Sequence, residues 1–312
     1  MLRKAALAGV VALLLLVPTA VTADKQVGVL RHFADMPSGL SAEGLAIDDG
    51  HFYVGAISFS SADGIVVVLD KSGAVEKEFT IPGLPVVGQV AVDKGGLFAV
   101  ACTAFDPSAT GAVVRVDLKS GAVTTVATES TCPNGLAVDH KGNMFVTNIF
   151  AGTVSKVTPD GAVSVFASGP LLATAAIPEG FVIGPNDIAF DKKGTALYVT
   201  DAGLDTVVKV EVQKDGTAGA ITDFAAGIPT PDGLAFDQKE NLYVNSPFTN
   251  SIFVVAPDGT VTPLALDTTQ ESLDNPSNVA FQGPQLYITN LSFTTGTGKI
   301  SVVAEQIPGI PV

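Results

Sequence analysis

A pair of short apolar segments separated by a polar turn occurs six times between residue 44 and the C-terminus. Clear copies are Gly44-Leu-Ala-Ile-Asp48 with Phe52-Tyr-Val54, and Gly135-Leu-Ala-Val-Asp139 with Met144-Phe-Val146. Successive copies are about 45 to 52 residues apart, which is typical of a four-stranded propeller blade. This repeat favours one large all-β domain over several smaller ones. The remaining copies begin at Val90, Asp187, Gly233 and Asn278.

Two further β-rich segments follow each of the first five pairs, joined by a glycine turn such as Pro159-Asp-Gly161. The sixth copy has only one such segment, Lys299 to Ala304, and an unassigned strand, Gln26 to Phe33, precedes the first copy. We therefore predict a six-bladed β-propeller over residues 24–312. Its last blade would be closed by the N-terminal strand, which removes both free sheet edges.

The first residues predict export. Arg3 and Lys4 precede an apolar run, Ala5 to Val17, and small residues follow at Val21-Thr-Ala23. This pattern is typical of a cleaved signal peptide, here residues 1–23, which implies a secreted or periplasmic protein. A retained membrane anchor on a cell-envelope component is the alternative. No later stretch is apolar enough to span a membrane, so none is expected after signal removal.

The charge of the chain limits its partners. There are 17 basic and 31 acidic residues, for a net charge of −14, which disfavours nucleic acid and anionic lipid and attracts cations. No pattern suggests oligomerisation, so a monomer is expected. Two cysteines, Cys102 and Cys132, would form a disulfide in an oxidising compartment if their geometry allows it.

An oxygen-bearing side chain stands at the start of every predicted innermost strand. Because the first strands of a propeller line its axis, all six can face one channel. Carboxylate and amide oxygens suit a hard cation such as calcium. The same residue types also form ordinary turns, although Glu43 is a poor turn former. The six residues are Glu43, Gln89, Asn134, Asn186, Asp232 and Asn278.

Four of these residues carry a family resemblance. They lie in the motifs Ala-Glu43-Gly-Leu-Ala, Cys-Pro-Asn134-Gly-Leu-Ala, Gly-Pro-Asn186-Asp-Ile-Ala and Thr-Pro-Asp232-Gly-Leu-Ala. The chain resembles the senescence-marker-protein, gluconolactonase and luciferin-regenerating-enzyme-like propellers, which are related to diisopropylfluorophosphatase and the paraoxonases. The resemblance implies that these four residues hold a divalent cation, usually calcium. Gln89 and Asn278 would be further channel residues with less defined roles. The chain departs from the family in having no tryptophan, and it lacks the metal-side histidines of paraoxonases.

The function that this resemblance implies is calcium-dependent hydrolysis of a lactone or another ester-like bond in a small molecule. Asp232 would act as nucleophile or activate a water, and Asn134 would orient ion and substrate. The alternative is a non-catalytic extracytoplasmic binding propeller, because fold alone does not determine function. The apolar connection from Ser168 to Pro185 either forms a lid or packs against the propeller itself. With Phe105, Phe248 and Phe293 in loops of the same face, we expect an aliphatic or aryl ester, or a lactone, rather than a charged sugar acid.

Overall fold

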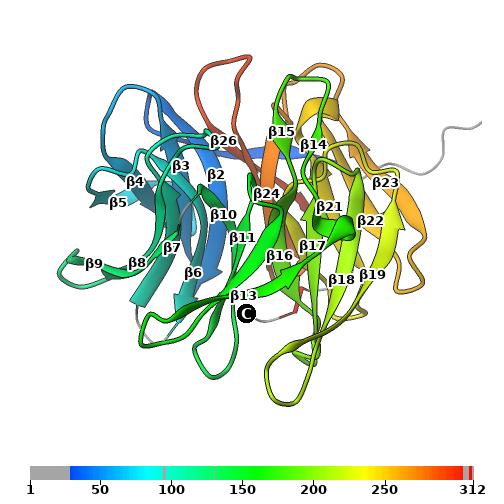
Figure 1. Cartoon of the computed structure of the whole chain (residues 1–312). Helices are drawn as coiled ribbons and strands as arrows, with labels where there is room; N and C mark the ends of the chain where they lie inside the picture. Colours follow the sequence, from blue (N-terminus) through cyan, green and yellow to red (C-terminus); the bar gives the residue numbers. More distant parts are fainter. Residues whose placement is uncertain (1–28, 94–95, 130, 305–308, 311–312) are drawn as a thin grey trace, which may run out of the picture.

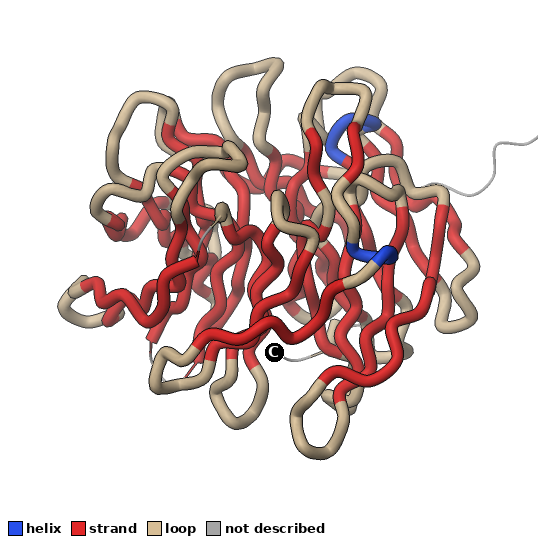
Figure 2. The backbone as a smooth tube through the Cα atoms, viewed as in Figure 1, coloured by secondary structure: helices blue, strands red, loops and turns tan. Residues whose placement is uncertain are grey.

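The computed structural model describes residues 29–93, 96–129, 131–304 and 309–310. Strands dominate this part of the chain, and its only helical segments are two 3-10 turns, Pro170–Leu172 and Pro247–Thr249 (Figures 1 and 2). The prediction of an all-β, propeller-like fold is confirmed. The predicted signal peptide lies outside the described residues. Within the described residues, no helix has the length and apolar character needed to span a bilayer.

Three of the sheets are antiparallel meanders of four consecutive strands, as the repeat predicts. Each innermost strand corresponds to the first apolar segment of a repeat. The first of these sheets comprises β10 (Pro133–Val138), β11 (Met144–Asn148), β12 (Thr153–Val157) and β13 (Val163–Ser168). The second comprises β16 (Pro185–Phe190), β17 (Ala196–Asp201), β18 (Thr206–Val212) and β19 (Ala218–Ala226). The third comprises β20 (Leu234–Phe236), β21 (Leu242–Ser246), β22 (Ser251–Val255) and β23 (Val261–Leu266).

A fourth four-stranded sheet joins the two ends of the chain, in the order β1-β26-β25-β24. The N-terminal strand β1 is antiparallel to β26, with Arg31 opposite Val302 and Asp35 opposite Lys299. The strand predicted over Gln26 to Phe33 is thus shifted toward the C-terminus, with residues 26–28 outside the described part. The strands of this sheet are β1 (Arg31–Asp35), β24 (Pro276–Gln282), β25 (Gln285–Asn290) and β26 (Lys299–Ala304).

The first two repeats share an eight-stranded sheet. A single residue pair, Ile57 with Val86, connects the two halves of this sheet. One half contains β2 (Leu40–Asp48), β3 (His51–Ser58), β4 (Gly64–Leu69) and β5 (Val75–Ile81). The other half contains β6 (Val86–Asp93), β7 (Gly96–Cys102), β8 (Gly111–Asp117) and β9 (Val123–Glu129).

The hydrophobic core lies between neighbouring sheets, where aromatic residues of the second strands meet. Tyr198 packs edge-on against Phe224 of its own sheet and Phe236 of the next, with ring centroids 4.7 and 5.0 Å apart. Phe33 of β1 packs against Phe52 and Tyr287, so the N-terminal strand contributes to the core as well as to the sheet. These aromatic residues hold the sheets together and do not line the channel. Burying rings of this size is a major contribution to stability in a chain without tryptophan.

Candidate metal centre

Each innermost strand is irregular at the same point, close to its start. In β2 the pairing passes from Ala42 opposite Ala56 to Leu45 opposite Val54, so two residues oppose the single residue Gly55. A β-bulge of this kind changes the direction in which side chains point. It is present in the other innermost strands whose pairing extends this far, at Val87/Val90, Pro133/Leu136, Pro185/Ile188 and Pro276/Asn278.

The bulge creates two positions per strand, which we call position one and position two. Position two directly precedes the apolar residue at which regular pairing resumes, for example Leu45 or Val90. The sequence-based expectation of six equivalent residues is therefore wrong, because Gln89 and Asn278 stand at position two. Position one holds Glu43, Gly88, Asn134, Asn186, Asp232 and Ser277. Position two holds Gly44, Gln89, Gly135, Asp187, Gly233 and Asn278.

Three of the innermost strands have glycine at position two, because the neighbouring innermost strand leaves no room for a side chain there. A Cβ atom added to Gly44 would lie 2.9 Å from Gln89 Oε1, and one added to Gly135 would lie 2.8 Å from Asp187 Oδ1. At Gly233 it would lie 2.4 Å from the Cα atom of Asn278. All three separations are shorter than an ordinary non-bonded contact of a Cβ atom. The glycines therefore let neighbouring innermost strands approach, and they leave room for the long side chains of position two.

Hydroxyl groups tie the innermost strands to one another. Thr200 of β17 donates a 2.6 Å hydrogen bond to the carbonyl oxygen of Asp232, and Thr289 of β25 donates one of 2.7 Å to that of Glu43. Thr147 of β11 makes the corresponding bond to the carbonyl oxygen of Asn186. Sequence reasoning missed these threonines, although the repeated Val-Thr or Ile-Thr of the second strands was a signal. These bonds hold three of the four residues predicted as metal ligands, Glu43, Asn186 and Asp232, around one centre.

Side chains at position two form a series of hydrogen bonds across this centre. Gln89 Nε2 donates to Asn278 Oδ1 at 3.2 Å, and Asn278 Nδ2 donates to Asp187 Oδ2 at 2.9 Å. Gln89 Oε1 accepts the backbone N–H groups of Leu45 and Val90 at 2.9 and 2.8 Å. Gln89 and Asn278 therefore have defined partners other than a cation. Asp187 was not among the predicted residues, and its carboxylate is the third acidic group of the site.

Three buried carboxyl groups lie close enough to influence one another. Burial raises the pKa of Glu43 to about 8, and the charge of Asp187 adds to the rise, against a hydrogen bond from Asn134 that lowers it. Burial raises the pKa of Asp187 to about 7. Burial, together with the charges of Glu43 and Asp187, raises the pKa of Asp232 well above its ordinary value. The two ion pairs of the described residues, at His32 and His51, involve none of these groups.

The oxygen atoms of this centre fit a hard cation. Glu43 Oε2, Asn186 Oδ1 and Asp187 Oδ1 are buried and have no hydrogen-bond partner in the described structure. Buried polar atoms normally have partners, and three unpartnered oxygens at one centre are chemically suited to a cation. The described residues contain no cluster of three or more His, Cys, Asp or Glu side chains with metal-site spacing. A cation would therefore depend on the amide oxygens of Asn134 and Asn186 as well as on carboxylates.

A disulfide lies beside one of the predicted ligands. Cys102 and Cys132 are bonded, with Cα atoms 5.0 Å apart, and both side chains are buried. The bond links the end of β7 to the residue just before β10, two positions from Asn134. The pairing, which the sequence left open, is present in the structure, and it restrains the segment that presents Asn134.

The long connection from Ser168 to Pro185 packs against the propeller, which is one of the two roles considered for it. Its two short strands, β14 (Ala175–Ala176) and β15 (Val182–Ile183), form a hairpin. Ile177 and Ile183 pack against Ile149 of the propeller, which fixes the hairpin on the fold. Phe181 and Val182 remain 41% and 54% exposed, respectively. The hairpin is thus a packed element with an exposed apolar tip.

The fold and this central polar site define a propeller-like protein with its candidate chemistry on the innermost strands. A model of the SMP-30/gluconolactonase/LRE-like region matches residues 137–292. The chain belongs to this family. A search of curated proteins finds no match.

Solved structures show the same fold over nearly the whole chain. A luciferin-regenerating enzyme is 15% identical, with a TM-score of 0.66, and the match covers 91% of this chain and 99% of that one. A gluconolactonase from Xanthomonas campestris is 19% identical, with a TM-score of 0.62 and coverage of 90% and 89%. Regucalcin from Agrobacterium tumefaciens, a calcium-binding protein, is 15% identical, with a TM-score of 0.62 and coverage of 90% and 99%. At these identities the likeness establishes the fold alone.

Proposed function

We propose that this protein is a divalent-metal-dependent hydrolase that acts on a lactone or another ester-like bond, with calcium as the first cation to test. The observation that carries the proposal is the centre formed by Glu43, Asp187 and Asp232. It holds three buried carboxyl groups, two of which have an unpartnered oxygen, and among the described residues none of the three forms an ion pair. Family membership and the gluconolactonase and regucalcin likenesses support the same conclusion.

We further infer that the ring has six blades. The eight-stranded sheet is treated as two blades because only the Ile57–Val86 pair joins its halves. The sheet that combines β1 with β24, β25 and β26 is then the closing blade. Ser277 Oγ supports this closure, since it donates to the carbonyl oxygen of Ala42 at 2.8 Å and so ties the last innermost strand to the first.

In the proposed mechanism, the residues that would hold the ion are Glu43, Asn134, Asn186 and Asp232. A bound divalent cation would polarise the substrate carbonyl and stabilise negative charge on its oxygen. Asp232 would take the proton of the attacking water or attack the carbonyl carbon itself. Asn134 keeps Glu43 oriented through its side-chain hydrogen bond, and it also orients the substrate.

We also propose the cellular location and the oligomeric state of the protein. The N-terminal pattern supports export and cleavage after residue 23, and the disulfide between Cys102 and Cys132 is compatible with an oxidising compartment. We propose a secreted or periplasmic monomer that meets a small-molecule substrate.

Thermal unfolding with added calcium tests the metal centre directly. The mature protein is stripped with chelator and titrated with calcium, alongside Glu43→Ala and Asp232→Ala. An ion that binds only the folded state stabilises it by about 2.7 kcal/mol at a hundred times its dissociation constant. The wild-type midpoint is therefore expected to rise by several degrees, and neither variant should respond.

A wild type indifferent to calcium, magnesium, manganese and zinc would overturn the metal centre and favour a non-catalytic binding propeller. If calcium binds, a screen of lactones and esters decides the activity. Binding without hydrolysis of any of them would leave the ion a structural role only.

A further inference from the structure

We propose that the site takes uncharged, largely apolar lactones or esters and rejects substrates that carry a negative charge. This inference rests on the proposed function and adds the substrate class. It comes from the face of the propeller on which the innermost strands begin, which we call the entrance face. The described loops of this face are residues 36–39, 59–63, 82–85, 103–110, 131–132, 149–152, 169–184, 202–205, 227–233, 247–250, 267–275 and 291–298.

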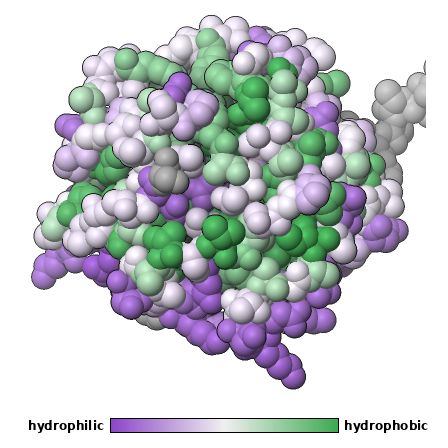
Figure 3. All heavy atoms as spheres, viewed as in Figure 1, coloured by the Kyte–Doolittle hydropathy of each residue, from purple (hydrophilic) through white to green (hydrophobic). Residues whose placement is uncertain are grey.

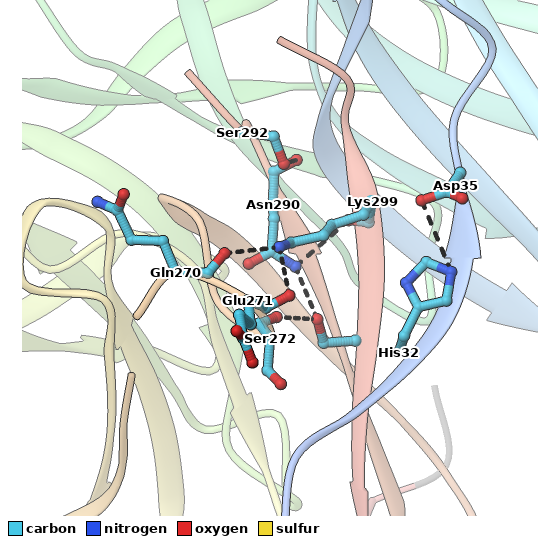
Figure 4. A network of polar contacts seen from close by, with 9 residues as sticks. His32, Asp35, Gln270, Glu271, Ser272, Asn290, Ser292 and Lys299 are labelled. Atoms are coloured by element: carbon cyan, nitrogen blue, oxygen red, sulfur yellow. Dashed lines mark hydrogen bonds and ion pairs between the residues drawn. The ribbon is translucent and has the colours of Figure 1, made fainter. Parts of the chain in front are cut away.

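No lysine, arginine or histidine occurs in these described loops. Lys299 begins the strand after the last loop, but its ammonium group is already used (Figure 4). It is buried, and it donates to the carbonyl oxygens of Gln270 and Glu271 at 3.0 and 2.7 Å. The described loops of the entrance face thus offer no free basic side chain to an anionic substrate. These loops carry eight acidic residues: Asp63, Asp106, Glu179, Asp205, Asp232, Asp267, Glu271 and Asp274.

The basic residues of the described turns lie on the opposite face. Because strands of an antiparallel meander alternate in direction, the turns after the first and third strands share that face. Figure 3 shows hydrophilic residues gathered at the bottom of the view. The turns of the opposite face also carry acidic residues, such as Asp70, Asp160 and Asp258, but there the basic residues offset most of them. No basic residue offsets the acids of the described entrance loops, so the electrostatic potential is more negative at the entrance, which lowers the local concentration of anions. The basic residues of the opposite face are Lys71, Lys119, His140, Lys141, Lys192, Lys193, Lys214 and Lys239.

Exposed aromatic side chains gather on the entrance face. Four phenylalanines of the described structure are both large and exposed, and all four lie in its loops: Phe59 at 72%, Phe105 at 36%, Phe181 at 41% and Phe293 at 53%. They form two groups. Phe59 and Phe293 have ring centroids 6.5 Å apart, and Phe105 lies 5.7 Å from Phe181. Aromatic side chains left in water at the mouth of a polar site indicate a ligand that covers them.

The Phe59–Phe293 pair flanks a pocket of about 310 Å³, which Ser41 and Ser292 also line. Ser41 lies on β2, two residues before Glu43. At about 3.3 Å of rise per residue, the backbone of Ser41 is roughly 7 Å from that of Glu43 along the strand. This separation matches a short acyl chain or an aryl ring attached to a carbonyl group at the metal centre. The pocket is therefore assigned to the apolar part of the substrate.

The same charge pattern favours product release. In hydrolysis, the oxygen of water bonds to the carbonyl carbon and the carbon–oxygen bond to the alcohol breaks. The alcohol oxygen takes one proton, and the new carboxylic acid loses its own proton to solvent. A neutral substrate is thus converted to an anionic product within an acidic entrance. Repulsion then acts on the product and not on the substrate.

Two esters that differ in one terminal group test this assignment on calcium-loaded full-length mature protein. The substrates are 4-nitrophenyl butyrate and the 4-nitrophenyl half-ester of succinic acid, which has a carboxylate in place of the terminal methyl group. The ratio of kcat/KM is expected to favour butyrate by at least about tenfold. Because salt screens exposed charges, the ratio should fall as sodium chloride rises.

A double variant, Phe59→Ser with Phe293→Ser, tests the pocket. Both side chains are mostly exposed, so the core is retained. KM for the butyrate ester is expected to rise on the order of tenfold, through lost apolar contact, with the calcium-induced thermal shift unchanged. Val165→Ser is the matched control, because Val165 is 65% exposed on the outer strand β13 and is expected to leave KM unchanged.

The outcomes separate the two proposals. Equal turnover of both esters, or a double variant with wild-type KM, would overturn the substrate class while the hydrolase survives. Absence of hydrolysis of every neutral and anionic ester and lactone would overturn the proposed function, and the substrate class with it.

Discussion

Asn278 Nδ2 donates a 2.9 Å hydrogen bond to Asp187 Oδ2, although the two residues are 91 positions apart. They belong to β24 and β16, and the bond crosses the centre on which the innermost strands converge. Asn278 is also bound by Gln89, so side chains from three sheets meet there. These hydrogen bonds fix Oδ2 of Asp187 and leave its other carboxylate oxygen, Oδ1, without a partner. The arrangement places a negative charge next to the proposed ligands.

Replacement of Asp187 by Asn tests the role of this charge. The amide keeps an oxygen for Asn278 but removes one negative charge from the centre. We expect calcium affinity to fall by about tenfold, since the charge acts at short range in a poorly solvated site. Isothermal titration calorimetry of the stripped protein measures this change.

Asp215→Asn is the control, because Asp215 lies exposed in a turn on the opposite face. An Asp187→Asn protein with wild-type calcium affinity would show that Asp187 serves only the series of hydrogen bonds at position two.

The metal-free protein should lose stability as the pH rises. The pKa of Glu43 rises from 4.5 to about 8 on folding, and that of Asp187 rises from 3.8 to about 7. Between these values the unfolded chain has released protons that the folded chain still holds, so the free energy of unfolding falls with pH. This stabilising contribution is complete below about pH 4 and is lost as the pH passes 7 to 8.

Thermal midpoints of the stripped protein from pH 5 to pH 8.5 measure the effect. Saturating calcium should flatten or reverse the decline, because the ion binds the deprotonated groups. A midpoint that rises with pH in the stripped protein would contradict the proposed electrostatics.

Much of this architecture could be predicted from the sequence, for physical reasons. Alternating apolar residues and glycine turns act locally, so the repeat identifies the strands and places Glu43, Asn134, Asn186 and Asp232 at the starts of the innermost ones. The bulge could not be predicted in this way, because one inserted residue leaves composition and spacing nearly unchanged. Without the bulge, the two positions before Leu45 and Val90 are not distinguished, so Gln89 was grouped with Glu43 although it corresponds to Gly44.

Asp187 was missed for a related reason. Asn186-Asp187 resembles an ordinary turn pair, so the second acid attracted no separate interpretation. Its importance comes from burial and from Asn278, and both depend on contacts between distant segments. The hydroxyl of Thr200 is a similar case, because the carbonyl oxygen that it binds belongs to the next sheet.

Gly135→Ala tests the close approach of the innermost strands. The new Cβ would lie 2.7 Å from the backbone oxygen of Asn186 and 2.8 Å from Asp187 Oδ1. We expect a loss of about 1–3 kcal/mol in the free energy of unfolding, and weaker calcium binding as Asn186 shifts. Chemical denaturation and calcium titration measure the two effects.

Gly180→Ala provides a comparison, because Gly180 has a positive φ of 94° but nothing within 4 Å of an added Cβ. Gly180→Ala should lower the free energy of unfolding through backbone strain and leave calcium affinity unchanged. Equal calcium affinity in both variants would argue against the proposed contact between the strands.

The disulfide should stabilise both the fold and the metal centre. Its cysteines are 30 residues apart, so the bond restrains a sizeable loop in the unfolded chain and is expected to contribute about 2–4 kcal/mol. Cys102→Ser with Cys132→Ser should lower the thermal midpoint and weaken calcium binding, because Asn134 is less restrained. A variant with a lower midpoint but intact calcium affinity would limit the bond to a structural role.

Asp232 is the residue on which turnover should depend most. Asp232→Asn keeps the shape of the side chain and an oxygen for the ion, but it removes the carboxylate that would take a proton or attack the carbonyl carbon. We expect kcat to fall by at least about a hundredfold, the scale of general acid–base contributions, with the β-type circular dichroism spectrum retained. The exposed Asp258→Asn, in a turn of the opposite face, serves as the control and should keep full activity. Esterase assays at saturating calcium separate loss of chemistry from loss of the ion. If Asp232→Asn turns over at the wild-type rate, the carboxylate is not the base or nucleophile, and Glu43 is the next residue to test.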